Sequence, residues 1–370
     1  MKILYISSAQ LPSKAANTVN VVKMCSAFAR LGHEVTLTFR SGAERPDLSA
    51  HYGVAPSFRC ERVSSRALPA IGGLLFGLAL RRKALQWGRP DFIYGRNLYG
   101  VAALAGLGVP FSLELHAVPG KRHLRALLGW IARQPACAKV VVISAALQRD
   151  LLSAIKGIHE SQILVAHDAA DLLPACEDTV ISSRVVSGRQ GALQVGFIGH
   201  LYPGKGMEMV ARLAGHLPEF DFHVVGGRDR ELAFWRAHCN ASNMHFHGFI
   251  PHAQLFRYYH AMDICIAPLQ AKVQGESGGN IAKWTSPLKI FEYMSAGKAI
   301  VASDLPVLRE VLTHEVNALL APCDDVAAWG RSLRLLEADG ALRSRLGKAA
   351  YEGFSTHHTW DSRAKLILAN

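Results

Sequence analysis

The stretch from Thr285 to Pro306 constrains this chain most, because it has the signals of a helix that ends at a glycine and leads into a buried strand. Ser286 and Pro287 suit an N-cap and a first helical position. Apolar residues then recur at helical spacing. Gly297 stands where a left-handed C-terminal residue belongs. Residues 299–302 are short, apolar and typical of a buried strand.

Lys289 departs from this pattern. It falls in the first turn, where the helix dipole disfavours a cation and a capping box would carry Glu. A lysine fits there if an anion binds the free backbone N–H groups and the ammonium together. The alternative is a surface lysine that tolerates a penalty of roughly a few tenths of a kcal/mol. The helix by itself leaves both interpretations open.

Residues 286–304 resemble the donor-site segment of the family four retaining glycosyltransferases. The resemblance implies an α/β fold of the GT-B type, with two Rossmann-like doubly wound domains facing across a cleft that holds the donor. It implies that Glu292 binds the ribose of a nucleotide sugar. Ser286, Pro287 and Leu288 match donor-binding positions, where backbone amides and a nearby basic residue hold the diphosphate.

Trp284 stands where the family usually has a second Glu, which contacts the transferred sugar. We expect the sugar to be held instead by stacking on Trp284, or by neighbours such as Asn280 or Lys283. The alternative is that the Gly- and Ser-rich loop from 271 shifts the register and Trp284 is simply packed.

A second anion-binding pattern precedes this one. Residues 193–198 form an expected strand, Gly199–Gly206 a glycine loop and 207–213 a helix. The loop matches a Walker A pattern as far as Lys205, but Gly206 replaces the Ser or Thr that would ligate magnesium. A P-loop NTPase is therefore disfavoured, while an anion cradle of glycines, lysine and helix N-terminus is favoured.

The family shares this loop and a later turn. The matching positions in the loop are Gly199, His200, Lys205 and Gly206. In the family, the backbone of the turn that corresponds to Gly248-Phe249-Ile250 contacts the nucleobase. Phe249 and Ile250 are therefore expected to bind the donor.

The first half opens as strand, loop, helix and strand, over residues 2–7, 8–17, 18–31 and 34–38, which begins a doubly wound domain. The family often has a Gly-Gly pair in this loop, and this chain has none. Asn17 or Asn20 is a candidate for its role. The alternative is an ordinary helix N-cap at Asn17 or Thr18.

His116 follows an expected strand at 111–115. A lone histidine is more often structural than catalytic, but open α/β sheets bind ligands at the carboxyl ends of strands, and this position makes His116 a candidate site residue. Glu114-Leu-His116 also resembles the family segment whose His lies against the donor sugar. We predict that His116 orients the sugar and is not a nucleophile.

Length and composition set the domain plan. A chain of 370 residues favours two domains. We expect an acceptor-side domain at 1–176, a polar linker at 177–192, a nucleotide-sugar domain at 193–353, and a C-terminal helix at 354–370 that packs back on the first domain. Seven scattered cysteines without a Cys-x-x-Cys pair fit a reducing cytosol. The first residues read as a strand and not as a signal peptide.

The net charge of +12 predicts an anionic partner. Apolar residues at 68–80 run into Arg81-Arg82-Lys83, and 121–133 is a second apolar and basic piece. Neither can span a bilayer, which takes ~20 residues. They fit peripheral docking on an anionic membrane surface. The alternative is two amphipathic core helices with solvated basic faces.

The resemblance to the family implies a retaining glycosyltransferase, with a glycan or lipid-linked acceptor of cell-surface polysaccharide synthesis. Asp-x-Asp, which metal-dependent glycosyltransferases use, is absent from the sequence. We therefore expect no metal and no cofactor, with Lys205 and Lys289 stabilising the leaving diphosphate. The alternatives are a GT-B-like epimerase or phosphorylase and a basic nucleic-acid-binding protein. The last is disfavoured, because no RNP, KH or zinc-finger pattern occurs.

Overall fold

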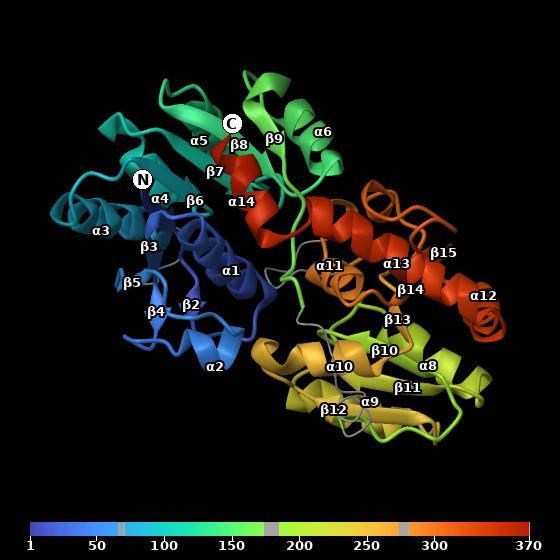
Figure 1. Cartoon of the computed structure of the whole chain (residues 1–370). Coiled ribbons are helices and arrows are strands. Elements are labelled where there is room, and N and C mark those ends of the chain that lie inside the picture. Colours follow the sequence, from blue (N-terminus) through green and yellow to red (C-terminus); the bar gives the residue numbers. More distant parts are fainter. Residues whose placement is uncertain (66–67, 69–70, 174–184, 274–279, 281, 370) are drawn as a thin grey trace. The chain divides into compact units, whose positions relative to one another are not determined.

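The computed structural model describes residues 1–65, 68, 71–173, 185–273, 280 and 282–369 (Figure 1). The chain divides into two compact units. Unit 1 comprises Met1–Asp168 with Trp360–Asn370, and unit 2 comprises Ala169–Thr359. Each unit is a parallel sheet with helices around it, so the predicted pair of Rossmann-like α/β domains is confirmed.

The sheet of unit 1 is built around its first strand, which lies between the third and the sixth. The chain winds outward to one edge, then returns and builds the other, so the order of strands reverses beside β1. Such a switch point is where doubly wound sheets bind ligands. The described strands, in spatial order, are β5 (Arg59–Arg62), β3 (Glu34–Phe39), β1 (Lys2–Ile6), β6 (Phe92–Gly95), β7 (Phe111–Leu115), β8 (Cys137–Val142) and β9 (Ile163–Val165).

Helices connect the strands of unit 1, and the last helix is added to this unit from the end of the chain. They are α1 (Ala16–Arg30), α2 (Leu48–Tyr52), α3 (Gly72–Gln86), α4 (Leu98–Leu104), α5 (Arg122–Ala132), α6 (Ala145–Ala154) and α14 (Trp360–Leu368), with a short pair of strands, β2 (Gln10–Leu11) and β4 (Ser41–Gly42). The N-cap of α1 is Ala15, so an N-cap at Asn17 or Thr18 was wrong. Helix α14 packs against α1, where Arg30 and Asp361 form an ion pair of 2.6 Å.

Unit 2 repeats the same plan. Its described strands, in spatial order, are β12 (Met244–Gly248), β11 (Asp221–Val225), β10 (Gln194–Ile198), β13 (Ile264–Ala267), β14 (Ala299–Ser303) and β15 (Leu319–Ala321). The helices are α8 (Met207–His216), α9 (Asp229–His238), α10 (Leu255–Ala261), α11 (Leu288–Ser295), α12 (Val326–Ala338) and α13 (Gly340–His357). Fully buried Trp329 of α12 packs in the core with Phe197, Phe222 and Val210.

The unit boundaries differ from the expected domain limits. The division falls at 168/169 and not at 176/177, because the chain after Asp168 bonds to unit 2. The hydroxyl of Ser295 donates to Asp171 O at 2.5 Å, and Ala170 N donates to His358 O at 3.1 Å. Helix α13 continues to His357, so the chain joins unit 1 at Trp360 and not at 354. Of the expected linker 177–192, residues 177–184 lie outside the described residues.

The organising stretch folds as its signals predict, with one shift. Helix α11 begins at Leu288 with Pro287 at the N-cap, so Ser286 precedes the helix and does not cap it. Gly297 has a φ of 63°, the left-handed conformation expected after a helix. The strand that follows, β14, is buried throughout.

Candidate functional site

Lys289 lies over the glycine loop of unit 2. A Cβ at Gly199 would stand 3.0 Å from both Cε and Nζ of Lys289, so only glycine leaves this space to the ammonium. The ammonium is 4.1 Å from the centroid of the Phe197 ring. It is buried and has no hydrogen-bond partner within the part of the chain that the structure describes. The first-turn lysine is therefore not a surface lysine.

The two lysines at the helix entrances share this environment. Burial, with a contribution from the charge of Lys205, lowers the pKa of Lys289 to about 7. Burial lowers the pKa of Lys205 to about 8. A buried cation is costly unless an anion pairs with it. The site is thus electrostatically suited to a ligand with concentrated negative charge.

The glycine loop approaches the neighbouring backbone too closely for side chains. A Cβ at Gly206 would lie 2.0 Å from Pro268 O, and one at Gly204 would lie 2.2 Å from Lys272 O. Gly206 is the N-cap of α8, with a φ of 98°. The loop therefore presents the backbone at the N-terminus of α8 beside Lys205, as an anion cradle requires.

His200 lies in the same loop and stacks on Tyr202, with ring centroids 5.3 Å apart. Burial and the positive charge of Lys205 lower the pKa of His200 to about 4. The imidazole is therefore neutral at pH 7, and it offers hydrogen bonds without adding a third cation.

Glu292 is buried in α11 and bonded through both carboxylate oxygens. His252 Nε2 lies 2.7 Å from Oε1, and Tyr259 donates its hydroxyl to Oε2 at 2.7 Å. Burial raises the pKa of Glu292, but the hydrogen bonds from His252 and Tyr259 and the charge of Lys289 outweigh it and lower the pKa. The carboxylate stays ionised, and each oxygen keeps a lone pair for a ligand hydroxyl.

Sequence reasoning missed His252 and Tyr259. Tyr259 lies on α10, and the spacing of residues along that helix gives no sign that its side chain faces a carboxylate. The signal that could have indicated them is Glu292, because a buried carboxylate needs hydrogen-bond donors beside it.

The turn at 248–250 follows β12. Gly248 has a φ of 74°, and its carbonyl accepts a hydrogen bond of 2.7 Å from Gly226 N. Phe249 is 37% exposed and Ile250 is half-buried. Because β10 and β12 belong to one parallel sheet, this turn and the Gly199 loop lie at the same edge.

Trp284 ends a short 3₁₀ turn, Ala282–Trp284, just before α11. The Lys283 ammonium lies 4.8 Å from the centroid of its indole. The Asn280 side-chain oxygen accepts hydrogen bonds of 3.0 Å from Val273 N and Ala282 N. The Asn280 side-chain oxygen therefore links the backbone of residues 273 and 282. Residues 274–279 and 281 of the predicted loop lie outside the described residues.

Unit 1 carries a separate polar cluster around His116. Gly95 of β6 pairs in register with Leu113 of β7, so the next residues, Arg96 and Glu114, are neighbours at the carboxyl ends of the strands. His116 Nε2 lies 2.5 Å from Glu114 Oε1 and 2.6 Å from Arg96 Nη2. The ring of His116 remains about one-third exposed.

Asn20 of α1 joins this cluster. Its amide donates to Asp168 Oδ1 at 2.6 Å, and its oxygen accepts from Arg96 Nη1 at 2.8 Å. Asn17 accepts from Arg96 through its backbone oxygen at 3.1 Å. Asn20 is thus buried with the predicted site histidine, while the Asn17 side chain is not part of these bonds.

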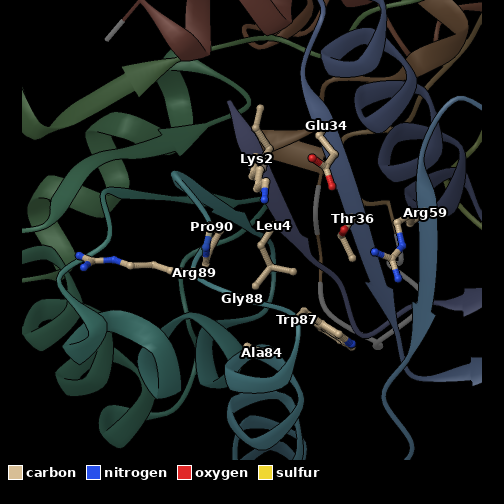
Figure 2. A pocket seen from close by; sticks show the side chains of 11 residues that line it. Lys2, Leu4, Glu34, Thr36, Arg59, Ala84, Trp87, Gly88, Arg89 and Pro90 are labelled. Atoms are coloured by element: carbon tan, nitrogen blue, oxygen red, sulfur yellow. The ribbon is translucent and has the colours of Figure 1, made fainter.

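Unit 1 has a pocket at the amino ends of its strands, opposite to the ends that carry His116. Figure 2 shows Lys2, Glu34 and Arg59 around it, at the amino ends of β1, β3 and β5. His116 and Arg96 stand at the carboxyl ends, so this pocket is not their site. Among the described residues, no three His, Cys, Asp or Glu side chains are placed to hold a metal ion.

Comparison with known proteins agrees with this geometry. The model of "Glycosyltransferase Family 4" matches residues 18–172, and that of "Glycosyl transferases group 1" matches residues 192–339. The crystal structure of HepE from Anabaena in complex with UDP aligns with a TM-score of 0.74 and 17% identity, covering 100% of this chain and 99% of that one.

Two curated relatives match over shorter segments. A phosphatidyl-myo-inositol mannosyltransferase of Mycolicibacterium smegmatis is 29% identical over 146 residues, which is 38% of this chain and 35% of that protein. An O-antigen biosynthesis glycosyltransferase of Escherichia coli, WbnH, is 25% identical over 108 residues, 29% of this chain and 28% of that protein. The chain spans about a third of the length of each.

Proposed function

Since this chain belongs to the family four glycosyltransferases, we propose that it moves a sugar from a nucleotide-diphosphate sugar to a glycan or lipid-linked acceptor, with retention of configuration. The observation that carries the proposal is the pair Lys289 and Lys205. Two cations with lowered pKa values stand beside a glycine loop, and Lys289 has no hydrogen-bond partner among the described residues.

The donor's diphosphate would supply the missing anion. As the bond to the sugar breaks, negative charge grows on the leaving phosphate. Lys289, Lys205 and the N-terminus of α8 would stabilise that charge without a metal ion. Glu292 would accept hydrogen bonds from the ribose hydroxyls through its remaining lone pairs, and the turn at Phe249 and Ile250 would contact the base.

His116 would orient the transferred sugar. Its ring is partly exposed, and Glu114 and Arg96 both lie beside the same ring nitrogen, Nε2. In a retaining transfer the leaving phosphate would take the acceptor's proton, so His116 would not be a nucleophile. His116→Ala should then lower kcat without loss of nucleotide binding.

The relatives guide the choice of donor and acceptor. UDP was bound in the HepE crystal structure, so uridine donors come first in a test. The names of the curated relatives include a phosphatidyl-inositol and an O-antigen, which supports a lipid-linked or polysaccharide acceptor.

An anionic membrane surface is a further proposed partner of unit 1. Helix α3 exposes Leu74, Leu78 and Leu85 at helical spacing, each more than half exposed, and it also carries Arg81 and Arg82. The predicted apolar and basic pieces thus include one helix with apolar side chains in solvent. No described helix is long and apolar enough to cross a bilayer.

A thermal-shift panel of UDP-, GDP- and ADP-sugars tests the proposal, because a bound donor raises stability by mass action. We expect one base to raise Tm and Lys289→Ala to abolish the rise. Product analysis with the stabilising donor then separates transfer from epimerisation. Absence of any shift, together with salt-sensitive binding to DNA, would favour the nucleic-acid-binding alternative.

A further inference from the structure

We infer that Glu114 and Arg363 are positioning residues for His116, so that the C-terminal helix α14 determines which ring nitrogen of His116 faces substrate. The role in sugar transfer rests on the proposed function. The structural claim about the ring of His116 does not.

Glu114 is the centre of the cluster. Its carboxylate is 1% exposed in β7, and the described residues give it four donors. Tyr94 donates its hydroxyl to Oε2 in a short hydrogen bond, and Arg363 Nη2 lies 3.1 Å from the same oxygen. On the other oxygen, Arg96 Nε lies at 3.4 Å and His116 Nε2 at 2.5 Å. Such pairing is what allows a buried carboxylate to stay charged.

The charge state of Glu114 follows from these contacts. Burial raises its pKa, but the charges of Arg363 and Arg96 and the hydrogen bond to His116 outweigh this effect and hold the pKa well below its usual range. The ionised carboxylate can only accept hydrogen bonds. His116 must therefore carry a proton on Nε2 to bond it.

Arg96 competes for the same nitrogen. Its Nη2 lies 2.6 Å from His116 Nε2, and a guanidinium can only donate, so it could bond Nε2 only if that nitrogen were unprotonated. Glu114 settles the competition while it is ionised. The proton stays on Nε2, and Nδ1 is the ring nitrogen left for substrate. Without the carboxylate, Arg96 would bond Nε2, and the proton would move to Nδ1.

Arg363 ties this arrangement to the end of the chain. It lies on α14, 249 residues from Glu114, and only 1% of its side chain is exposed. Its Nε donates to His167 O at 2.8 Å, and Nη2 also lies 3.3 Å from Ala166 O. The planar guanidinium thus fixes Glu114 against the segment after β9. A lysine would keep the charge but not this fork.

The test uses full-length protein labelled with ¹⁵N at histidine, at a pH where the imidazole is neutral. The wild type should show His116 protonated at Nε2. Glu114→Gln should shift the signal toward the Nδ1-protonated form and lower kcat by about tenfold to a hundredfold, the cost of a misplaced group. The donor KM and nucleotide affinity should not change, because the nucleotide contacts proposed above lie in unit 2.

Arg363→Lys and Asp361→Asn separate positioning from the docking of α14. Arg363→Lys should shift the His116 signal partly and lower kcat. Asp361→Asn breaks the surface ion pair between α14 and α1, at 2.6 Å, and should change neither. A folded Glu114→Gln with wild-type tautomer and kcat would overturn the inference.

The experiment still decides if Glu114→Gln does not fold or if the protein has no transferase activity. If Glu114→Gln does not fold, Arg363→Lys decides, and an unchanged tautomer together with unchanged kcat would overturn the role of α14. If no form of the protein transfers sugar, the proposed function fails, while the nitrogen signals of His116 still confirm or refute the positioning.

Discussion

The ammonium of Lys289 lies 4.1 Å from the centre of the Phe197 ring, on the strand that leads into the glycine loop. The ring face attracts the cation but cannot replace a counter-ion. A cation in the first turn of α11 is disfavoured by the helix dipole as well. The ligand-free fold thus holds a charge that a bound diphosphate would neutralise.

Lys289→Met should stabilise the ligand-free protein and abolish activity. Removing a buried unpaired charge should raise the free energy of unfolding at pH 7 by about 1–3 kcal/mol. Chemical denaturation with and without donor measures it. Lys348→Met, at a lysine side chain that is 79% exposed, is the control and should change neither property. A destabilised Lys289→Met would contradict the account of an unpaired charge.

The same lysine predicts a pH dependence of stability. Its pKa is about 7 in the folded protein and 10.5 as the ordinary value, so the unfolded chain binds more protons between these limits. Stability therefore rises with pH across this window, and the penalty is complete below it. The stability gap between Lys289→Met and wild type should be largest below pH 7 and shrink as the pH increases from 7 toward 10.5. A stability difference between the two proteins that does not change with pH would show that the pKa of Lys289 is not lowered.

Glu292→Ala should raise the donor KM sharply. Ribose hydroxyls would lose a charged acceptor, which is worth ~1.5–3 kcal/mol, or roughly tenfold to a hundredfold in affinity. Glu292→Gln, which keeps the shape and loses the charge, should give a smaller increase. Calorimetric titration of the nucleotide checks the same effect without turnover. Unchanged donor binding in a folded variant would remove Glu292 from the site.

Turnover should survive EDTA, because Lys205 and Lys289 are proposed to stabilise the leaving group. Lys205→Ala should lower kcat by orders of magnitude, since one donor to a developing anion is worth about 10²–10³ in rate. Lys348→Ala serves as the matched control. Loss of activity in EDTA with rescue by Mn²⁺ would show that the charge is stabilised by metal instead.

Trp284→Glu should change which donor sugar is preferred, because it restores the acidic residue that the family usually has at this position. Competition between UDP-glucose and UDP-galactose measures the preference, after the base is known. An identical ratio in both proteins would favour a packed Trp284 without sugar contact.

Binding to anionic vesicles should fall when Leu78 of α3 is replaced by Ser, and binding of the wild type should weaken with salt. Leu335→Ser, at a leucine 45% exposed on α12, is the matched control and should bind as the wild type does. Sedimentation with anionic and with neutral vesicles measures the binding. Equal absence of binding to both would end the membrane hypothesis.

The sequence by itself determined the features that depend on neighbouring residues. The fold class, the strands beside Gly199 and the helix ending at Gly297 follow from local spacing, because apolar period and glycine conformation act within a few residues. His116 and Lys289 stood out for the same reason, since strand ends and helix starts are local signals.

Only the tertiary structure decided which side chains surround these residues. Glu292 meets Tyr259 at a sequence separation of 33, and Arg363 meets Glu114 at 249. No local pattern encodes such pairs, because they form only when α10 packs beside α11, or when α14 returns to the first sheet. The alternative of a helix cap at Asn17 fails because α1 begins at Ala16, before both asparagines. Asn20 instead bonds Asp168 across 148 residues, a partner that no local pattern indicates.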